Sequence, residues 1–157
     1  MPTPLTEGQP APGFTADTDS GASVSLENFA GKHVVLYFYP KDDTPGCTTQ
    51  ACGFRDSISP LEAEGAVVLG ISLDSIESHQ TFRDKYELPF TLLSDPQHEI
   101  ADAYGVYGKQ SFMGREYMGL DRATFLIAPD GTLQKVWPKV DPSGHAEEVL
   151  AALREHK

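Results

Sequence analysis

Two uninterrupted apolar runs constrain the fold of this chain more than any other feature. They read HVVLYFYP, residues 33–40, and AVVLGIS, residues 66–72. Neither alternates between polar and apolar side chains, as a strand with one solvated face would, so each is predicted to be a central strand buried on both faces. A helical pattern separates them, from Thr48 to about Ser57. Buried strands that alternate with helices predict an α/β protein.

The rest of the chain continues this alternation. One or two short strands are expected near Phe14 and Val24, and Ser59-Pro60 is expected to begin a new helix, because proline is tolerated in a first turn. The later predicted elements are a polar helix over residues 75–85, a short strand over 90–95, a helix over 97–104, a hairpin over 123–137 that turns at 129–131, and an amphipathic helix over 143–155. This order predicts a single domain, residues 1–157, of the α/β class, with a mixed central β-sheet flanked by helices and close to the thioredoxin-like fold.

Charge and hydropathy argue against two kinds of partner. The net charge of −11 disfavours nucleic acid, which is bound through Lys and Arg. No apolar run approaches the roughly 20 residues that cross a membrane, and the start, MPTPLTEGQPAPGF, has neither the basic nor the apolar region of a signal peptide. We therefore expect a cytoplasmic protein. In that reducing compartment a permanent disulfide is disfavoured, and 157 residues bury enough surface to fold without one.

Both cysteines of the chain, Cys47 and Cys52, lie in the segment YPKDDTPGCTTQACGFRD, residues 39–56. A structural clasp, half of a metal site and a reactive thiol are the alternatives. A zinc site needs four ligands, usually at recurring spacings, whereas the five histidines are scattered and each is expected at the surface. The sequence has no CxxCH haem motif and no GxGxxG or Walker loop. We therefore expect no metal and no cofactor, and chemistry carried out by side chains.

The residues before Cys47 are those of a helix start. Thr44 can serve as the N-cap and Pro45 as the first helical residue, which places Cys47 in the first turn. Unpaired backbone N–H groups and the positive end of the helix dipole favour a thiolate there. Asp42 and Asp43 oppose this effect, because nearby carboxylates raise the pKa of a thiol. A cationic partner for Cys47 is therefore expected.

Thiolate formation alone accounts for little reactivity. Lowering a cysteine pKa from about 8.5 to about 6 raises the thiolate fraction at neutral pH by roughly 30-fold. The weaker nucleophilicity of a less basic thiolate takes back roughly 10-fold or more. A fast thiol enzyme must therefore also direct hydrogen-bond donors at its substrate, and Thr44 and an arginine are the groups to seek.

The same segment resembles the peroxiredoxins, and most of all their bacterioferritin comigratory protein (PrxQ) subgroup. Pro40, Thr44 and Cys47 match the family motif Pro-x-x-x-Thr-x-x-Cys, and TPGCTTQACGFRD matches the longer pattern of the subgroup. The similarity covers essentially the whole chain, through APGF near the start, VLGIS, FTLLSD, SFMG and DRATFLIAPDG. The resemblance implies a thiol peroxidase that reduces hydrogen peroxide and organic hydroperoxides in antioxidant defence.

The resemblance also implies a role for each matching residue. Cys47 would be the peroxidatic cysteine, which becomes a sulfenic acid, and Cys52 would be the resolving cysteine, which forms an intramolecular disulfide with it. Thioredoxin, or a similar dithiol reductant, would reduce that disulfide. Thr44 would hydrogen-bond the sulfur and the peroxide, and Pro40 would shield the sulfur from water. Arg122 matches the arginine of the family and would be the expected cation.

Other readings stay open at this point. Position 50 is glutamine, where many of these sequences carry glutamate, and its role is undecided. No cysteine follows Cys52, so a resolving cysteine near the C-terminus of a dimer partner is unavailable, and a monomer is expected. A thiol–disulfide oxidoreductase is disfavoured by the C-x4-C spacing, because that class usually relies on CxxC. A non-enzymatic domain with a structural clasp is the third alternative.

The spacing of the cysteines makes one prediction about shape. In a regular helix, residues five apart have Cα atoms about 8.7 Å from each other, whereas a disulfide needs less than about 7 Å. If Cys47 and Cys52 share a helix, their disulfide requires that helix to unwind locally. Gly53 disfavours the helix by about 1 kcal/mol relative to alanine, which makes such unwinding easier.

Overall fold

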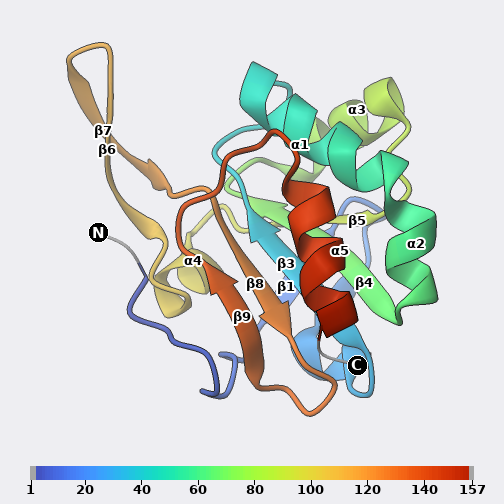
Figure 1. Cartoon of the computed structure of the whole chain (residues 1–157). Coiled ribbons are helices and arrows are strands. Elements are labelled where there is room, and N and C mark those ends of the chain that lie inside the picture. Colours follow the sequence, from blue (N-terminus) through green and yellow to red (C-terminus); the bar gives the residue numbers. More distant parts are fainter. Residues whose placement is uncertain (1–2, 156–157) are drawn as a thin grey trace.

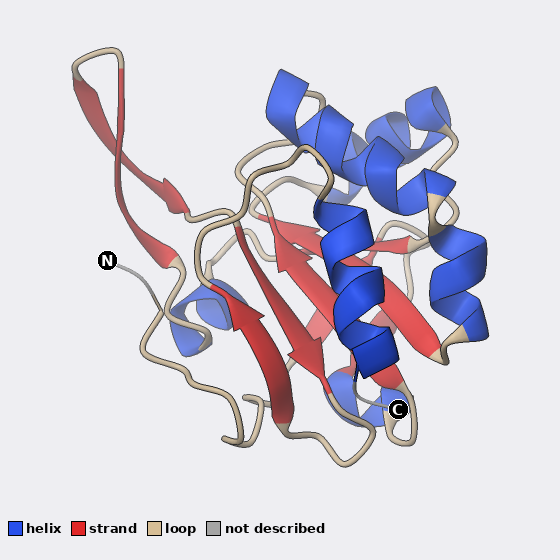
Figure 2. Cartoon of the chain, in the orientation of Figure 1, coloured by secondary structure: helices blue, strands red, loops and turns tan. Residues whose placement is uncertain are grey.

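The structure, a computed structural model, describes residues 3–155 of the chain. Its elements follow one another in the order β1 (Thr15–Thr18), β2 (Ser23–Ser25), the 3-10 helix η1 (Leu26–Phe29), β3 (His33–Phe38), α1 (Pro45–Asp56), α2 (Ile58–Ala63), β4 (Ala66–Ser72), α3 (Ile76–Tyr86), β5 (Thr91–Ser94), α4 (Glu99–Ala103), β6 (Tyr107–Phe112), β7 (Arg115–Leu120), β8 (Ala123–Ile127), β9 (Leu133–Trp137) and α5 (His145–Glu155). Seven strands form one mixed sheet, and β6 and β7 form a separate hairpin (Figures 1 and 2).

The central sheet has the strand order β2-β1-β5-β4-β3-β8-β9. Strands β3, β4 and β5 are parallel, whereas β8 runs antiparallel to β3, and β1 antiparallel to β5. The two apolar runs of the sequence are thus neighbouring strands, in register at Leu36 and Leu69. The predicted α/β class and mixed sheet are confirmed. The carboxyl ends of β3, β4 and β5 lie at one edge, where open α/β sheets place their sites.

Side chains of β3 alternate between two apolar cores, one on each face of the sheet. Val35 and Tyr37 point to the core that α1, α2, α3 and α5 cover, and Leu36 and Phe38 point to the core that α4 and the N-terminal segment cover (Figure 1). All four side chains are at most 1% exposed. This explains why the run is apolar without alternation, since burying each such side chain contributes about 1.5–3 kcal/mol.

The structure corrects one expectation about local structure and adds one element that was not predicted. Helix α2 begins at Ile58 after the N-cap Ser57, not at Ser59-Pro60, and its proline lies within the first turn, where it costs no internal hydrogen bond. The β6–β7 hairpin, which projects from the body in Figure 1, was not predicted. Its turn has positive φ at Met113 (52°) and Gly114 (80°), as a two-residue turn of type I′ requires, and Gly114 was the only signal for it.

The histidines also differ from expectation. His79 and His145 are 0% and 1% exposed, so the prediction that each histidine lies at the surface is wrong for these two. His156 lies outside the described residues. Within residues 3–155, no helix has the length and apolar character needed to span a membrane.

Candidate active site

Cys47 occupies the first turn of α1, directly after the loop that leaves β3. Thr44 is the N-cap, in the extended conformation at φ −101° and ψ 156°, as the sequence predicts. The Thr44 hydroxyl donates to the carbonyl of Lys41 (2.8 Å) and makes no capping bond to the helix. It therefore leaves the first-turn N–H groups to other acceptors. Cys47 is a free thiol with 1% exposure.

Arg122 reaches this turn from the loop before β8, the strand that pairs with β3. It precedes β8, whose first residue, Ala123, pairs with Phe38 at the end of β3. Its Nη1 donates to Oε1 of Gln50 (2.8 Å). A Cβ atom added to Gly46 would lie 2.9 Å from Nη2 of Arg122, so the guanidinium rests against the backbone beside Cys47. The predicted cation is therefore at the helix start, and Gln50 holds it there.

Both carboxylates of the loop are paired with side chains of α3. Asp42 is buried and contacts Nδ1 of His79 (2.7 Å). Asp43 is exposed and accepts from Lys85 (2.8 Å) and from the hydroxyl of Tyr86 (2.7 Å). The hydrogen bonds from Lys85 and Tyr86 lower the pKa of Asp43. Each of the two carboxylates that the sequence places before Cys47 thus has a partner within the fold.

Two buried polar atoms around Cys47 have no hydrogen-bond partner among the described residues. They are the hydroxyl of Tyr37 and Nε2 of Gln50. Burial raises the pKa of the Tyr37 phenol far above its ordinary value, and the neighbouring charges of Cys47 and Asp42 add to the effect, so the phenol stays protonated. Buried polar groups are normally paired. Both groups are therefore buried donors without a partner in the described part of the chain, one on β3 and one on α1. Sequence reasoning missed Tyr37, which appears only as part of an apolar run.

Cys52 lies in the same helix as Cys47, as the spacing argument assumes, and it is half-buried and also a free thiol. The two Cα atoms of such a pair are about 8.7 Å apart in a regular helix, beyond the reach of a disulfide. Gly53 follows Cys52 and faces α5, where a Cβ atom would lie 3.8 Å from Cβ of Ala146. The structure shows the reduced arrangement and confirms the helical placement of both cysteines.

An open pocket of about 520 Å³ adjoins the turn. Pro40 and Arg122 line it, and Tyr117, Leu120 and Val140 supply apolar walls. Pro40 is itself exposed, so it forms the rim between this pocket and the loop. A small molecule with one apolar end and one polar end fits such a lining.

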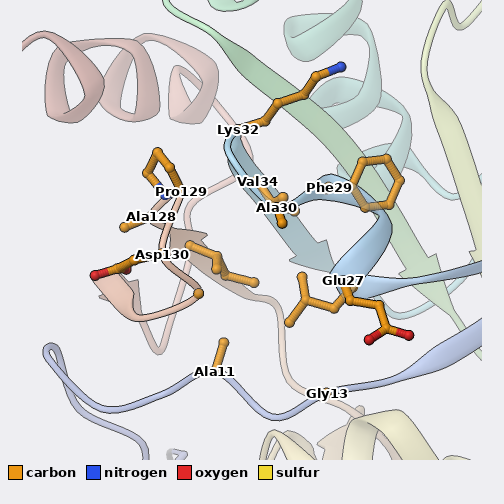
Figure 3. Close-up of a pocket in the computed structure, with 13 residues that line it drawn as sticks. Ala11, Gly13, Glu27, Phe29, Ala30, Lys32, Val34, Ala128, Pro129 and Asp130 are labelled. Carbon is orange, nitrogen blue, oxygen red and sulfur yellow. The ribbon is translucent and has the colours of Figure 1, made fainter.

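Figure 3 shows the residues that line a second hollow, of about 290 Å³. Ala11, Val34 and Ala128 are among its lining residues. Val34 is at the start of β3, whereas Cys47 follows the end of that strand. The lining contains neither cysteine nor Arg122, so the chemistry does not take place there.

The fold and the site together define a thiol-based redox enzyme of the thioredoxin-like α/β class, with a buried cysteine at a helix start beside an arginine. The AhpC/TSA family model matches residues 7–136 of the chain. Peroxiredoxin Bcp of Escherichia coli is 46% identical over 153 residues, covering 98% of both chains, and Peroxiredoxin Bcp of Bacillus subtilis is 47% identical over 148 residues, covering 94% of both.

A solved structure of the Xanthomonas campestris bacterioferritin comigratory protein superposes with a TM-score of 0.86 at 38% identity, covering 91% of both chains. The chain therefore belongs to the AhpC/TSA family, as a thiol peroxidase of the peroxiredoxins named Bcp or Q. The resemblance stated from the sequence is confirmed. The family implies a peroxide substrate and a thiol reductant.

Proposed function

We propose that Cys47 is the peroxidatic cysteine of this enzyme. Its thiolate attacks the terminal oxygen of a hydroperoxide, an S–O bond forms, and the O–O bond breaks. Sulfur is oxidised to the sulfenic acid, and the leaving alkoxide or hydroxide takes up a proton to become an alcohol or water. The observation that carries the proposal is the placement of Cys47 in the first turn of α1 with the Arg122 guanidinium against Gly46.

Three residues support this step. Arg122 directs its charge at the helix start, where negative charge moves from sulfur to the leaving oxygen, and electrostatic stabilisation of this kind is usually the largest catalytic contribution. Thr44, whose hydroxyl now donates to Lys41, can turn to the peroxide or the sulfur when substrate enters. Pro40, at the rim of the pocket, limits the access of water to Cys47.

Cys52 is proposed as the resolving cysteine. Its thiol attacks the sulfenic sulfur of Cys47, releases water, and leaves the intramolecular Cys47–Cys52 disulfide. Thioredoxin, or a similar dithiol protein, then reduces the disulfide by exchange and restores both thiols. The support is that Cys47 and Cys52 are both free in one helix, five positions apart.

Organic hydroperoxides are proposed as substrates beside hydrogen peroxide. The alkyl chain would lie in the pocket beside Arg122, against Tyr117, Leu120 and Val140. The related X. campestris protein is described as having alkyl peroxide reduction activity. We also propose that the enzyme acts in the cytoplasm as a monomer and as a single domain. The cytoplasm is supported because a catalytic dithiol needs a supply of reductant. A single domain is supported because both apolar cores pack on the one central sheet.

A coupled assay tests the proposal. Peroxide, thioredoxin, thioredoxin reductase and NADPH are combined with wild-type protein or with Cys47→Ser, and NADPH oxidation is followed. Turnover with wild type and none with Cys47→Ser is the expected result. Retained turnover in Cys47→Ser would reject the assignment of Cys47. Insulin reduction that is faster than peroxide reduction would instead identify a thiol–disulfide oxidoreductase.

A further inference from the structure

A buried polar network lies beneath the loop that carries Thr44 and Cys47, at the edge of the sheet where β3, β4 and β5 end. Its centre is Asp42, whose Oδ1 accepts from the hydroxyl of Tyr39 (2.6 Å) and whose Oδ2 accepts from the hydroxyl of Ser78 (2.8 Å). Oδ2 also lies 2.7 Å from Nδ1 of His79. The backbone N–H of Asp42 donates to Oδ2 of Asp74 (2.8 Å). Asp42 is 7% exposed and His79 is 0% exposed.

The hydrogen bonds determine the charge state of His79. Its Nε2 lies 2.7 Å from the carbonyl oxygen of Leu93, which can only accept, so Nε2 carries a proton. Two hydroxyl donors already point at the carboxylate of Asp42, which favours an acceptor role for it toward Nδ1 as well. Both ring nitrogens are then protonated. His79 and Asp42 form a buried imidazolium–carboxylate pair, and the ring has no lone pair left for a metal.

The pair connects elements that are far apart in the sequence. His79 belongs to α3, its carbonyl partner belongs to β5, and Asp42 lies two residues before Thr44, the N-cap of α1. Asp42 is therefore fixed relative to two other elements by directional bonds. Because Thr44 and Cys47 follow within five residues, the same bonds define where the helix start lies relative to Arg122.

We propose that His79 is a positioning residue for the peroxidase reaction: its ion pair with Asp42 holds the loop before α1 so that Thr44 and Cys47 face Arg122. This inference rests on the proposed role of Cys47. Among the described residues, no hydrogen bond or ion pair joins His79 to either cysteine, so it acts through the loop. No sequence motif pointed to it, because its partner is 37 residues away.

The pair makes the position of the loop depend on pH. Burial lowers the pKa of His79, but the hydrogen bond and charge of Asp42, the Leu93 carbonyl and the charge of Asp74 outweigh burial and raise the pKa above its ordinary value. The other group facing the ring, Tyr39, has its pKa raised by burial and by Asp42, so it stays neutral. The stabilisation that the pair gives to the loop before α1 is therefore complete below a pH of about 6.5. It is lost as pH rises through the folded pKa of His79.

The experiment measures the rate of Cys47 sulfenic acid formation against pH by stopped flow, in wild type and in His79→Asn. The asparagine can still donate to Asp42 but carries no charge. We expect an alkaline decline in wild type, and in His79→Asn a rate lower by about 10- to 100-fold at neutral pH with no such decline. The matched control is His98→Asn, which removes a surface histidine paired with Asp102 (2.8 Å) and should leave the rate unchanged.

A second measurement keeps the outcome decisive. Nitrogen NMR of wild-type protein should show both ring nitrogens of His79 protonated at neutral pH, and they should lose a proton over the same pH range as the alkaline decline. This readout does not require the variant to fold. A neutral His79 ring at pH 7, or an alkaline decline that persists in folded His79→Asn, would overturn the proposal.

A failure of the proposed function would look different. In that case wild-type Cys47 would not react with peroxide at any pH. The loop can then be followed through alkylation of Cys47 by iodoacetamide, which needs no peroxidase activity. A change in the alkylation rate that follows the titration of His79 would still support the positioning role, whereas a rate that follows only thiol ionisation would contradict it.

Discussion

The two halves of α1 are held in different ways. Around Cys47, the helix is fixed by directional polar contacts: Arg122 donates to Gln50 and rests on Gly46. Around Cys52, the contacts are mainly apolar, apart from the hydrogen bond that Arg55 donates to the carbonyl of Tyr86 (2.8 Å). Phe54 is fully buried and stacks on Tyr37, with ring centroids 4.8 Å apart. Cys52 itself is only half-buried.

This difference matches what each cysteine has to do. A peroxidatic sulfur must be in place before substrate arrives, and hydrogen bonds specify position. A resolving sulfur must travel, since the helical geometry leaves the pair too far apart to bond. Unwinding the second half removes Phe54 from its core position, which costs about 1.5–3 kcal/mol, an amount that disulfide formation can offset.

The largest effect is expected from replacing each of the two cysteines by serine, one at a time. Cys47→Ser should abolish turnover, because the serine hydroxyl is not ionised and no other thiol lies at the helix start. Cys52→Ser should consume one equivalent of peroxide per molecule and then stop, with a sulfenic acid that dimedone traps. Mass spectrometry distinguishes the two products. Dimedone labelling of Cys52 in the Cys47→Ser protein would reverse the proposed roles.

Removing the cation tests the first half of the helix. Arg122→Ala should slow sulfenic acid formation by about 10²-fold, the usual loss when a donor to a developing anion is deleted. Arg115→Ala is the matched control, since Arg115 is exposed on β7, outside the site. Stopped-flow rates that are equal in Arg122→Ala and Arg115→Ala would remove Arg122 from the mechanism.

A smaller change tests the position of that cation. In Gly46→Ala the new methyl group would lie 2.9 Å from Nη2 of Arg122, so the flexible end of the arginine must shift. We expect sulfenic acid formation to slow by roughly 10-fold, about 1.4 kcal/mol of transition-state stabilisation. Thermal unfolding should show no loss of stability, because alanine favours the helix. An unchanged rate would mean that Arg122 acts without close contact.

The smallest effect should fall on the second half alone. Gly53→Ala places a methyl group at 3.8 Å from Cβ of Ala146, an ordinary contact, and stabilises the helix by about 1 kcal/mol. Disulfide closure should therefore slow roughly 5-fold, while sulfenic acid formation stays at the wild-type rate. Rapid quench followed by mass spectrometry separates these steps. Slowing of both steps would mean that the two halves of α1 move together.

Sequence reasoning succeeded where the information is local. The buried strand Ala66–Ser72 follows from its composition, and Cys47 at the start of a helix follows from Thr44 and Pro45. Both depend on residues that are neighbours in the chain. Arg122 was found only through resemblance to a family, because β8 brings it beside β3 from a distant part of the sequence.

The features that were missed depend on pairing in space. His79 was taken for a surface residue because a single histidine in a polar helix says nothing of a carboxylate 37 positions earlier. The partnerless hydroxyl of Tyr37 is hidden in a run that is otherwise apolar. The β6–β7 hairpin lacks the polar turn residues that usually mark one, since Met113 occupies a positive-φ position that Asn or Gly normally takes.

The central claim is that Cys47 stays fixed while Cys52 moves. Amide hydrogen exchange across residues 45–57 of the reduced protein and of the oxidised protein, with the disulfide confirmed by mass, tests it most directly. We predict faster exchange in the oxidised protein from about Cys52 to Ser57, together with protection of the surrounding strands that does not change. Equal protection of this segment in both states would contradict the account.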